Sequence, residues 1–217
     1  MKRKIFLALA VALLPALTAA AQDRPKPYFG ARVAMDITEP GHGDKYFDTG
    51  SGFSVGGIVN IPVYRGFYFE PGVAFTLNTM GIKGMLREDG YLYDGSARTM
   101  GIRVPLNFGY AFQLLDNLSL GVYTGPWLNF NVSAREHVTP NFSTPDPVPE
   151  FKNNLFSKGW KHFDAQWGFG LSVTFAQHYH LGLSGGVSIT PLAQYGNKDK
   201  KIRIHRNIIA ISLGYNF

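Results

Sequence analysis

Histidine is the residue type in this 217-residue chain that most directly suggests chemistry, because the sequence has six histidines and no cysteine. His178 and His180 flank Tyr179, and the period of two along a strand would place both imidazoles on one face, where they could bind a metal weakly. No carboxylate lies beside them in the sequence, and the H-x-H spacing is unspecific. We therefore interpret them as interfacial turn histidines and predict neither a metal nor a cofactor. The lack of cysteine also excludes disulfides, a thiol nucleophile and a lipoprotein anchor.

A hydrolase is the second chemistry to consider, because Ser, His and Asp side chains can form a catalytic triad. His162 and His205 lie near the ends of predicted strands, and Asp164 and Ser184 lie in nearby segments. No G-x-S-x-G or comparable motif supports a nucleophile, so we predict a protein that is not an enzyme. Side chains from separate strands can still converge, and a lipid-modifying enzyme therefore stays open as the alternative.

Five charged residues fall on the faces of alternating segments that otherwise carry mostly small or polar side chains: Arg32, Asp36, Glu70, Arg103 and Asp164. Four of them, Arg32, Glu70, Arg103 and Asp164, make up the predicted interior network. We predict that they form a polar network in the interior that neutralises itself, since an unpaired buried charge is costly. Glu70 is the expected partner of Arg103 or Arg32. The alternative is an ion path through the interior.

The segment from about 133 to 161 is the candidate partner-binding loop. Its prolines make it extended, and Phe142, Phe151, Phe156 and Trp160 supply large apolar side chains. Long loops with such side chains often carry binding, but a lid packed on itself over the mouth of the fold has equal support. A second long segment contains the basic run "KDKKIRIHR" at 198–206, which we interpret as a solvated loop. Because no Lys/Arg block outside the first residues favours nucleic acid, we predict no nucleic-acid partner.

Eight segments with strict alternation must position these residues. In each, one face is apolar and free of charge while the other is small or polar, which indicates β-strands. The segments cover about 28–37, 51–63, 66–80, 98–114, 117–132, 162–175, 179–190 and 207–217.

The connections between these segments alternate between long and short, which is the layout of an outer-membrane barrel with long loops outside and short turns in the periplasm. Aromatic residues gather on the apolar faces near both ends, as expected of interfacial girdles. We predict an all-β fold, an eight-stranded antiparallel up-and-down transmembrane β-barrel. A soluble sandwich would also alternate, and a soluble lipocalin-like barrel would need its apolar side chains inside.

The last strand carries a terminal signature in Tyr215 and Phe217, which share the apolar face of "NIIAISLGYNF". Every backbone group of a sheet in lipid must be paired, so this strand should pair with the first and close the barrel. We therefore expect Phe217 at the girdle of the short-turn end.

The N-terminus has the pattern of a secretory signal peptide. Lys2, Arg3 and Lys4 precede an apolar run at 5–17, and small residues follow up to Ala21. That run is shorter than the ~20 residues that a membrane anchor needs. We predict a cleaved signal peptide at 1–21 and one barrel domain at 22–217.

The terminal "AISLGYNF" and the opening "YFGARVAMDI" resemble small outer-membrane β-barrel proteins of Gram-negative bacteria, most closely the PorT-like outer-membrane β-barrel domain family. The resemblance implies a protein in contact with outer-membrane lipid, inserted by the barrel-assembly machinery, with other envelope proteins as possible partners. Some members of the family are linked to secretion. An eight-stranded barrel is just wide enough for side chains to fill, so we expect a monomer with a binding, structural or secretion-accessory role and not a general porin.

Overall fold

The computed structural model describes residues 26–41, 47–86, 92–138, 152–195 and 202–217. The predicted signal peptide at 1–21 lies outside these residues. Among the described residues, no helix has the length and apolar character needed to cross a membrane.

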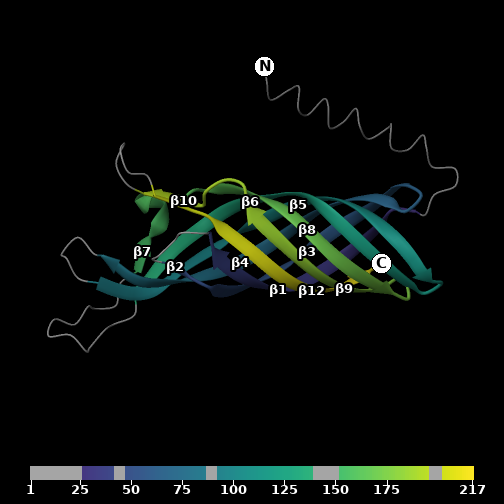
Figure 1. Ribbon diagram of the computed structural model, residues 1–217, viewed down its shortest axis with the longest axis horizontal. Coiled ribbons are helices and arrows are strands. Elements are labelled where there is room, and N and C mark those ends of the chain that lie inside the picture. The colour runs from purple at the N-terminus through teal and green to yellow at the C-terminus, as the bar shows by residue number, and fades with distance from the viewer. Residues whose placement is uncertain (1–25, 42–46, 87–91, 139–151, 196–201) are drawn as a thin grey trace, which may run out of the picture.

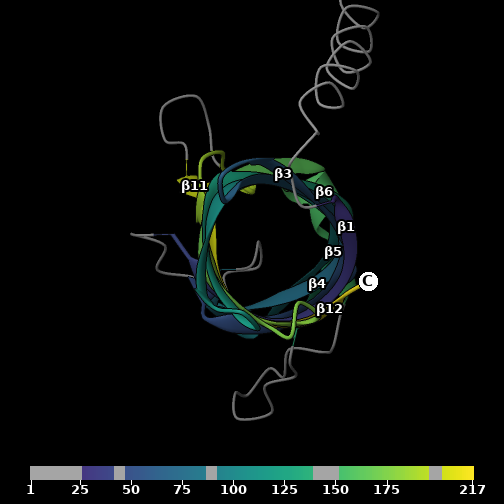
Figure 2. The same ribbon diagram turned by 90° about the vertical axis from the view of Figure 1, so that its right-hand side faces the viewer.

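Eight long strands form a closed antiparallel ring, as the sequence predicted (Figures 1 and 2). Each strand pairs with its neighbour in the chain, and the last pairs with the first, from Gly30 opposite Asn216 to Pro40 opposite Arg206. The eight strands are β1 (Tyr28–Pro40), β3 (Gly50–Tyr64), β4 (Phe67–Leu86), β5 (Leu92–Leu115), β6 (Leu118–Val138), β8 (Phe163–Phe175), β9 (Tyr179–Ser188) and β12 (Arg206–Asn216).

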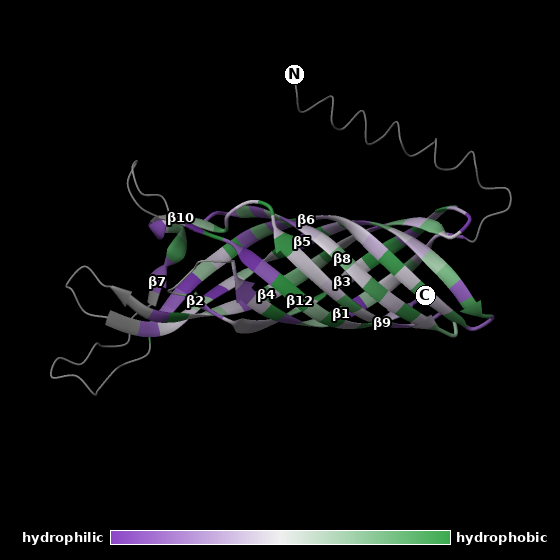
Figure 3. Cartoon of the chain, in the orientation of Figure 1, coloured by the Kyte–Doolittle hydropathy of each residue, from purple (hydrophilic) through white to green (hydrophobic). Residues whose placement is uncertain are grey.

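The apolar face of the strands points outward. Val33 stands opposite Leu213 on one side and Val55 on the other, and both Val33 and Leu213 are more than half exposed. Figure 3 shows the resulting alternation of hydrophobic and hydrophilic residues along each strand. The soluble lipocalin-like alternative is therefore wrong for this chain, because it needs the reverse orientation.

Aromatic rings lie in contact at both ends of the apolar band. At the short-turn end, the ring centroids of Phe67 and Tyr110 are 4.8 Å apart, and those of Tyr215 and Phe217 are 5.3 Å apart. At the long-loop end, Phe130 and Phe163 are paired across β6 and β8 with centroids 5.3 Å apart. Two belts of this kind around an aliphatic band match the two interfaces of a bilayer.

The chain end is part of the sheet. The backbone N–H of Phe217 donates to the carbonyl oxygen of Phe29 at 2.8 Å, and that of Asn216 donates to the carbonyl oxygen of His178 at 2.8 Å. Tyr215 and Phe217 therefore lie where the terminal signature was expected, on the outward face at the short-turn end.

Strands β4, β5 and β6 continue well beyond the ends that the sequence pattern indicated, and short elements pack on this extension. The inward face of this extension is mostly apolar, whereas the inward face of the rest of the barrel is mostly polar; the exception is Glu136, which is 1% exposed and paired with Lys158. The short elements are β2 (Phe47–Asp48), β7 (Lys152–Asn154), the 3-10 helix η1 (Leu155–Lys158), β10 (Ala193–Tyr195) and β11 (Ile202–Ile204). The buried apolar cluster, called the cap here, consists of Phe47, Met80, Ile82, Ala97, Ala134, Val138, Leu155, Trp160, Leu192, Ala193 and Ile204.

Candidate functional site

Two buried ion pairs occupy the lumen of the barrel. Arg103 Nη2 lies 3.2 Å from Asp36 Oδ2, and Arg206 Nη2 lies 2.9 Å from Asp164 Oδ1. The four side chains are at most 7% exposed. Both pairs join strands that are not neighbours in the ring, so they cross the interior.

The side chain of Asn129 joins the two ion pairs into one network. Asn129 accepts from Arg103 Nε at 3.2 Å and donates to Asp164 Oδ2 at 3.0 Å. Arg206 also donates to Thr99 Oγ1 at 3.0 Å. The lumen network therefore runs from β1 through β5, β6 and β8 to β12.

The predicted pairing of Glu70 with Arg103 is wrong. In the register of β4 and β5, Ala74 is opposite Arg103 while Glu70 is opposite Asn107, four residues nearer the short turns. Glu70 is instead hydrogen bonded by Asn60 Nδ2 at 3.2 Å. Arg32, the other expected partner, donates from Nη2 to Asn216 Oδ1 at 2.8 Å and so ties β1 to the chain end.

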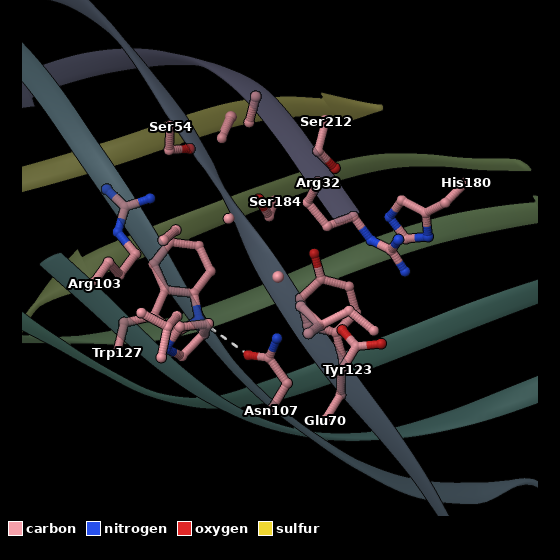
Figure 4. A pocket seen from close by; sticks show the side chains of 18 residues that line it. Arg32, Ser54, Glu70, Arg103, Asn107, Tyr123, Trp127, His180, Ser184 and Ser212 are labelled. Atoms are coloured by element: carbon pink, nitrogen blue, oxygen red, sulfur yellow. Dashed lines mark hydrogen bonds between the residues drawn. The ribbon is translucent and has the colours of Figure 1, made fainter. Parts of the chain in front are cut away.

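Aromatic side chains fill the barrel next to the network and leave a cavity of about 100 Å³. Figure 4 shows Arg103 and Trp127 on one side of this cavity and Arg32, Glu70 and His180 on the other. The Trp127 indole donates to Asn107 Oδ1 at 3.0 Å, and the Arg103 guanidinium lies 5.2 Å from the centre of its ring. The volume corresponds to roughly three water molecules.

The cap lies beyond the network, at the long-loop end. Trp160 is 4% exposed inside it, and its ring lies 6.3 Å from that of Phe47. Phe156 packs against the cap and stacks on His162. The prediction that Trp160 binds a partner is therefore wrong, because its burial leaves no surface for one. Two other candidate partner-binding residues, Phe142 and Phe151, lie outside the described residues. Within the described part of the chain, the lid interpretation fits this segment better.

The opposite end of the barrel holds a vestibule of about 770 Å³, lined by residues of all three short turns. Glu70 and His180 line both the vestibule and the cavity, so they form the floor between the two. Hydroxyl and amide groups make up much of the remaining wall, among them Asn60, Ser172 and Asn216. Alternation along single strands does not predict this vestibule, because its wall is assembled from several strands and turns.

Within the described part of the chain, the histidines form neither a three-ligand metal site nor the Ser–His–Asp arrangement that the sequence suggested. His178 and His180 both line the vestibule, but no group of three metal-ligating side chains occurs among the described residues. Asp164 is engaged by Arg206, and Ser184 lines the cavity. His205 instead contacts Ser188, whose Oγ lies 3.1 Å from His205 Nδ1.

Arg206 and Asp36 are members of the lumen network that the four residues predicted from the sequence did not include. The basic run at 198–206 predicts a solvated loop for Arg206, yet this residue is the first of β12 and only 2% exposed. Its parity was a usable signal, because it shares the series of Ser212 and Asn216, which face the lumen. Asp36 shares the parity of Arg32 in the same way.

Comparison with known proteins gives a family and several distant structures. Residues 27–194 match the family model described as outer membrane protein beta-barrel domain. Comparison with curated proteins gives no match. Among solved structures, Ail, the attachment invasion locus protein of Yersinia pestis, is 12% identical, with 89% of this chain and 100% of that chain covered and a TM-score of 0.48. The outer membrane protein OprG from Pseudomonas aeruginosa is 9% identical, with 88% and 95% covered and a TM-score of 0.46.

Proposed function

The chain belongs to the outer membrane protein beta-barrel domain family, and from this membership we propose that it is a closed barrel with a binding or structural role in the cell envelope. It is an integral β-barrel protein of the outer membrane. Its role there is neither general diffusion nor catalysis.

The observation that carries the proposal is the network across the lumen. Two ion pairs joined through Asn129 cross the barrel, Trp127 packs beside them, and the cap adds an apolar layer at the long-loop end. A water-filled channel would need an open path past these groups. The ion-path alternative is disfavoured, because each charge in the network already has an opposite charge within 3.2 Å.

The vestibule supports a binding role at the short-turn end. Its volume of about 770 Å³ lies within the usual 300–1,000 Å³ range of small-molecule sites. The wall offers both aromatic rings, such as Tyr68, and polar groups, such as Asn60 and His180. We infer that this end faces the periplasm and the long loops face outward, as short turns and long loops do in bacterial barrels.

The finer assignment follows from the sequence resemblance. The opening "YFGARVAMDI" and the terminal "AISLGYNF" support placement among PorT-like barrels, and with it an accessory role in secretion or surface assembly. In this proposal the barrel acts as a monomer in contact with outer-membrane lipid. The barrel-assembly machinery inserts it, and other envelope proteins are its partners.

A catalytic role has less support. The Ser188–His205 contact is the arrangement closest to a hydrolase, but the Ser188 hydroxyl also donates to the carbonyl oxygen of Thr190 at 2.8 Å. The one acid that the sequence suggested, Asp164, is held by Arg206.

Electrical recording in planar bilayers tests the proposal. We expect the refolded protein to show no large, steady conductance under conditions in which an unrelated general porin conducts. A stable, porin-like open state in the wild-type protein would refute the closed barrel.

A further inference from the structure

Two arginines on the outer surface have no partner in the part of the chain that the structure describes. Arg98 in β5 and Arg135 in β6 are both exposed, and neither makes an ion pair or a hydrogen bond through its guanidinium there. The strand register places them directly opposite each other. Directly opposed residues of an antiparallel pair have Cβ atoms about 4.5–5.5 Å apart, so both guanidinium groups occupy one place on the surface.

The arginine pair, Arg98 and Arg135, stands at the edge of the lipid-facing band. On β5, Ile102 shares the outward face of Arg98 and is 42% exposed. On β6, Val132 and Phe130 are the exposed apolar residues nearest to Arg135. Figure 3 shows hydrophobic segments along the barrel and hydrophilic ones toward β2 and β7. The pair therefore lies at the level where acyl chains end and headgroups begin.

No carboxylate among the described residues neutralises this pair. Like charges directly opposite each other destabilise a sheet. The next residues along the same rung are neutral, with Thr79 of β4 beside Arg98 and Asn154 of β7 beside Arg135. Two adjacent cations without a carboxylate form a site that an external anion would complete.

We propose that the arginine pair binds a phosphate group of a lipid headgroup in the surrounding leaflet. A guanidinium presents its N–H groups in a planar fork that matches the oxygens of a phosphate, and two adjacent forks can hold one phosphate from both sides. The position beside Ile102 and Val132 favours a lipid over a soluble polyanion, because the acyl chains of the same molecule would lie on those side chains. With the orientation proposed above, the lipid is the phosphorylated glycolipid of the outer leaflet.

Lys83 provides a matched control on the same outer surface. It is exposed, and its ammonium group pairs with the carboxylate of Asp48. The hydrogen bond from Lys83 lowers the pKa of Asp48. Both side chains are therefore ionised at physiological pH, and the pair as a whole carries no net charge. Lys83 is therefore an exposed cation that needs no external anion.

The test measures retention of lipid A on the full-length protein in neutral detergent by native mass spectrometry. Arg98→Gln and Arg135→Gln should each weaken retention about fivefold and the double variant more than about tenfold, whereas Lys83→Gln should leave it unchanged. Replacing both arginines by lysine should give an intermediate loss, because the charge remains but the fork does not. Heat-modifiable migration on gels verifies that each variant is folded.

Two results would overturn the inference: unchanged retention in the double glutamine variant, or equal retention of lipid A from which the phosphates have been removed. Competition by millimolar inorganic phosphate as strong as that by lipid A would identify a free-anion site and reject the lipid headgroup. Conductance in planar bilayers would contradict the closed lumen without affecting this result, because the arginine pair lies on the outer surface.

Discussion

Arg103 is neutralised from the far side of the lumen, and this explains both its burial and why Glu70 is not its partner. Its partner Asp36 is on β1, and β3 and β4 lie between β1 and β5 in the ring. Alternation along the strands is enough to predict which charged residues face inward, namely Arg32, Asp36, Glu70, Arg103 and Asp164. It could not show which of them meet, because contacts across a barrel depend on strand stagger and tilt.

Removing one member of the lumen network should destabilise the barrel more than removing both. Arg103→Met leaves the Asp36 carboxylate buried without its cation, which should cost about 3–5 kcal/mol of unfolding free energy. The double variant Asp36→Asn, Arg103→Met removes both charges and should recover a large part of that loss. Urea unfolding in lipid vesicles measures the free energy of unfolding of each variant. Ile211→Ala, on the outward face and away from the lumen, is the control. Additive losses in the double variant would show that the pair is not coupled.

At the scale of elements, the eight long strands could be predicted because each has one continuous apolar face. The extension of β4 to β6 could not, because the pattern changes there. A register irregularity opposite Met100 and Gly101 shifts the parity of β6, so Asn129 and Asn131 face inward below it and Ala134 and Val138 face inward above it. Above the lipid band water replaces acyl chains outside the barrel, and the apolar residues therefore turn inward to form the cap.

The turn between β8 and β9 contains a local weakness that can be removed. Ala176 and Gln177 both have positive φ, 49° and 62°, a region that suits glycine better than other residues. Gln177→Gly should therefore stabilise the barrel by about 1 kcal/mol, because glycine adopts positive φ without strain. The substitution keeps the backbone carbonyl of residue 177, which accepts a hydrogen bond from the Asn216 side chain.

The control for this turn is Ala111→Gly in β5, which is not among the positive-φ residues of the described chain and should lose about 0.5–1 kcal/mol. Urea midpoints of the two variants, measured in the same vesicles, make the comparison. Destabilisation by Gln177→Gly would mean that its side chain contributes more to the short-turn end than its backbone costs.

At the scale of the whole molecule, lipid and water explain the three levels of the lumen. The vestibule lies at the short-turn end, the network crosses the middle, and the cap lies at the long-loop end. The polar interior follows from an outward face that must be apolar in lipid, which the sequence already indicated. The vestibule and the cap arise from how turns and loops meet in space, which alternation along single strands does not describe.

Closure of the ring between β1 and β12 is the claim on which the lumen network, the cap and the vestibule all depend. The chain has no cysteine of its own, so pairs of introduced cysteines report this contact without background. Val33→Cys with Leu213→Cys joins residues that are directly opposite, whereas Val33→Cys with Ile209→Cys is displaced by four residues, about 13 Å along the strand. Oxidation of native outer membranes should cross-link the first pair and leave the second reduced, because a disulfide requires Cα atoms within about 7 Å. Cross-linking of the displaced pair, or of neither pair in protein that is folded in the membrane, would contradict a barrel closed in this register.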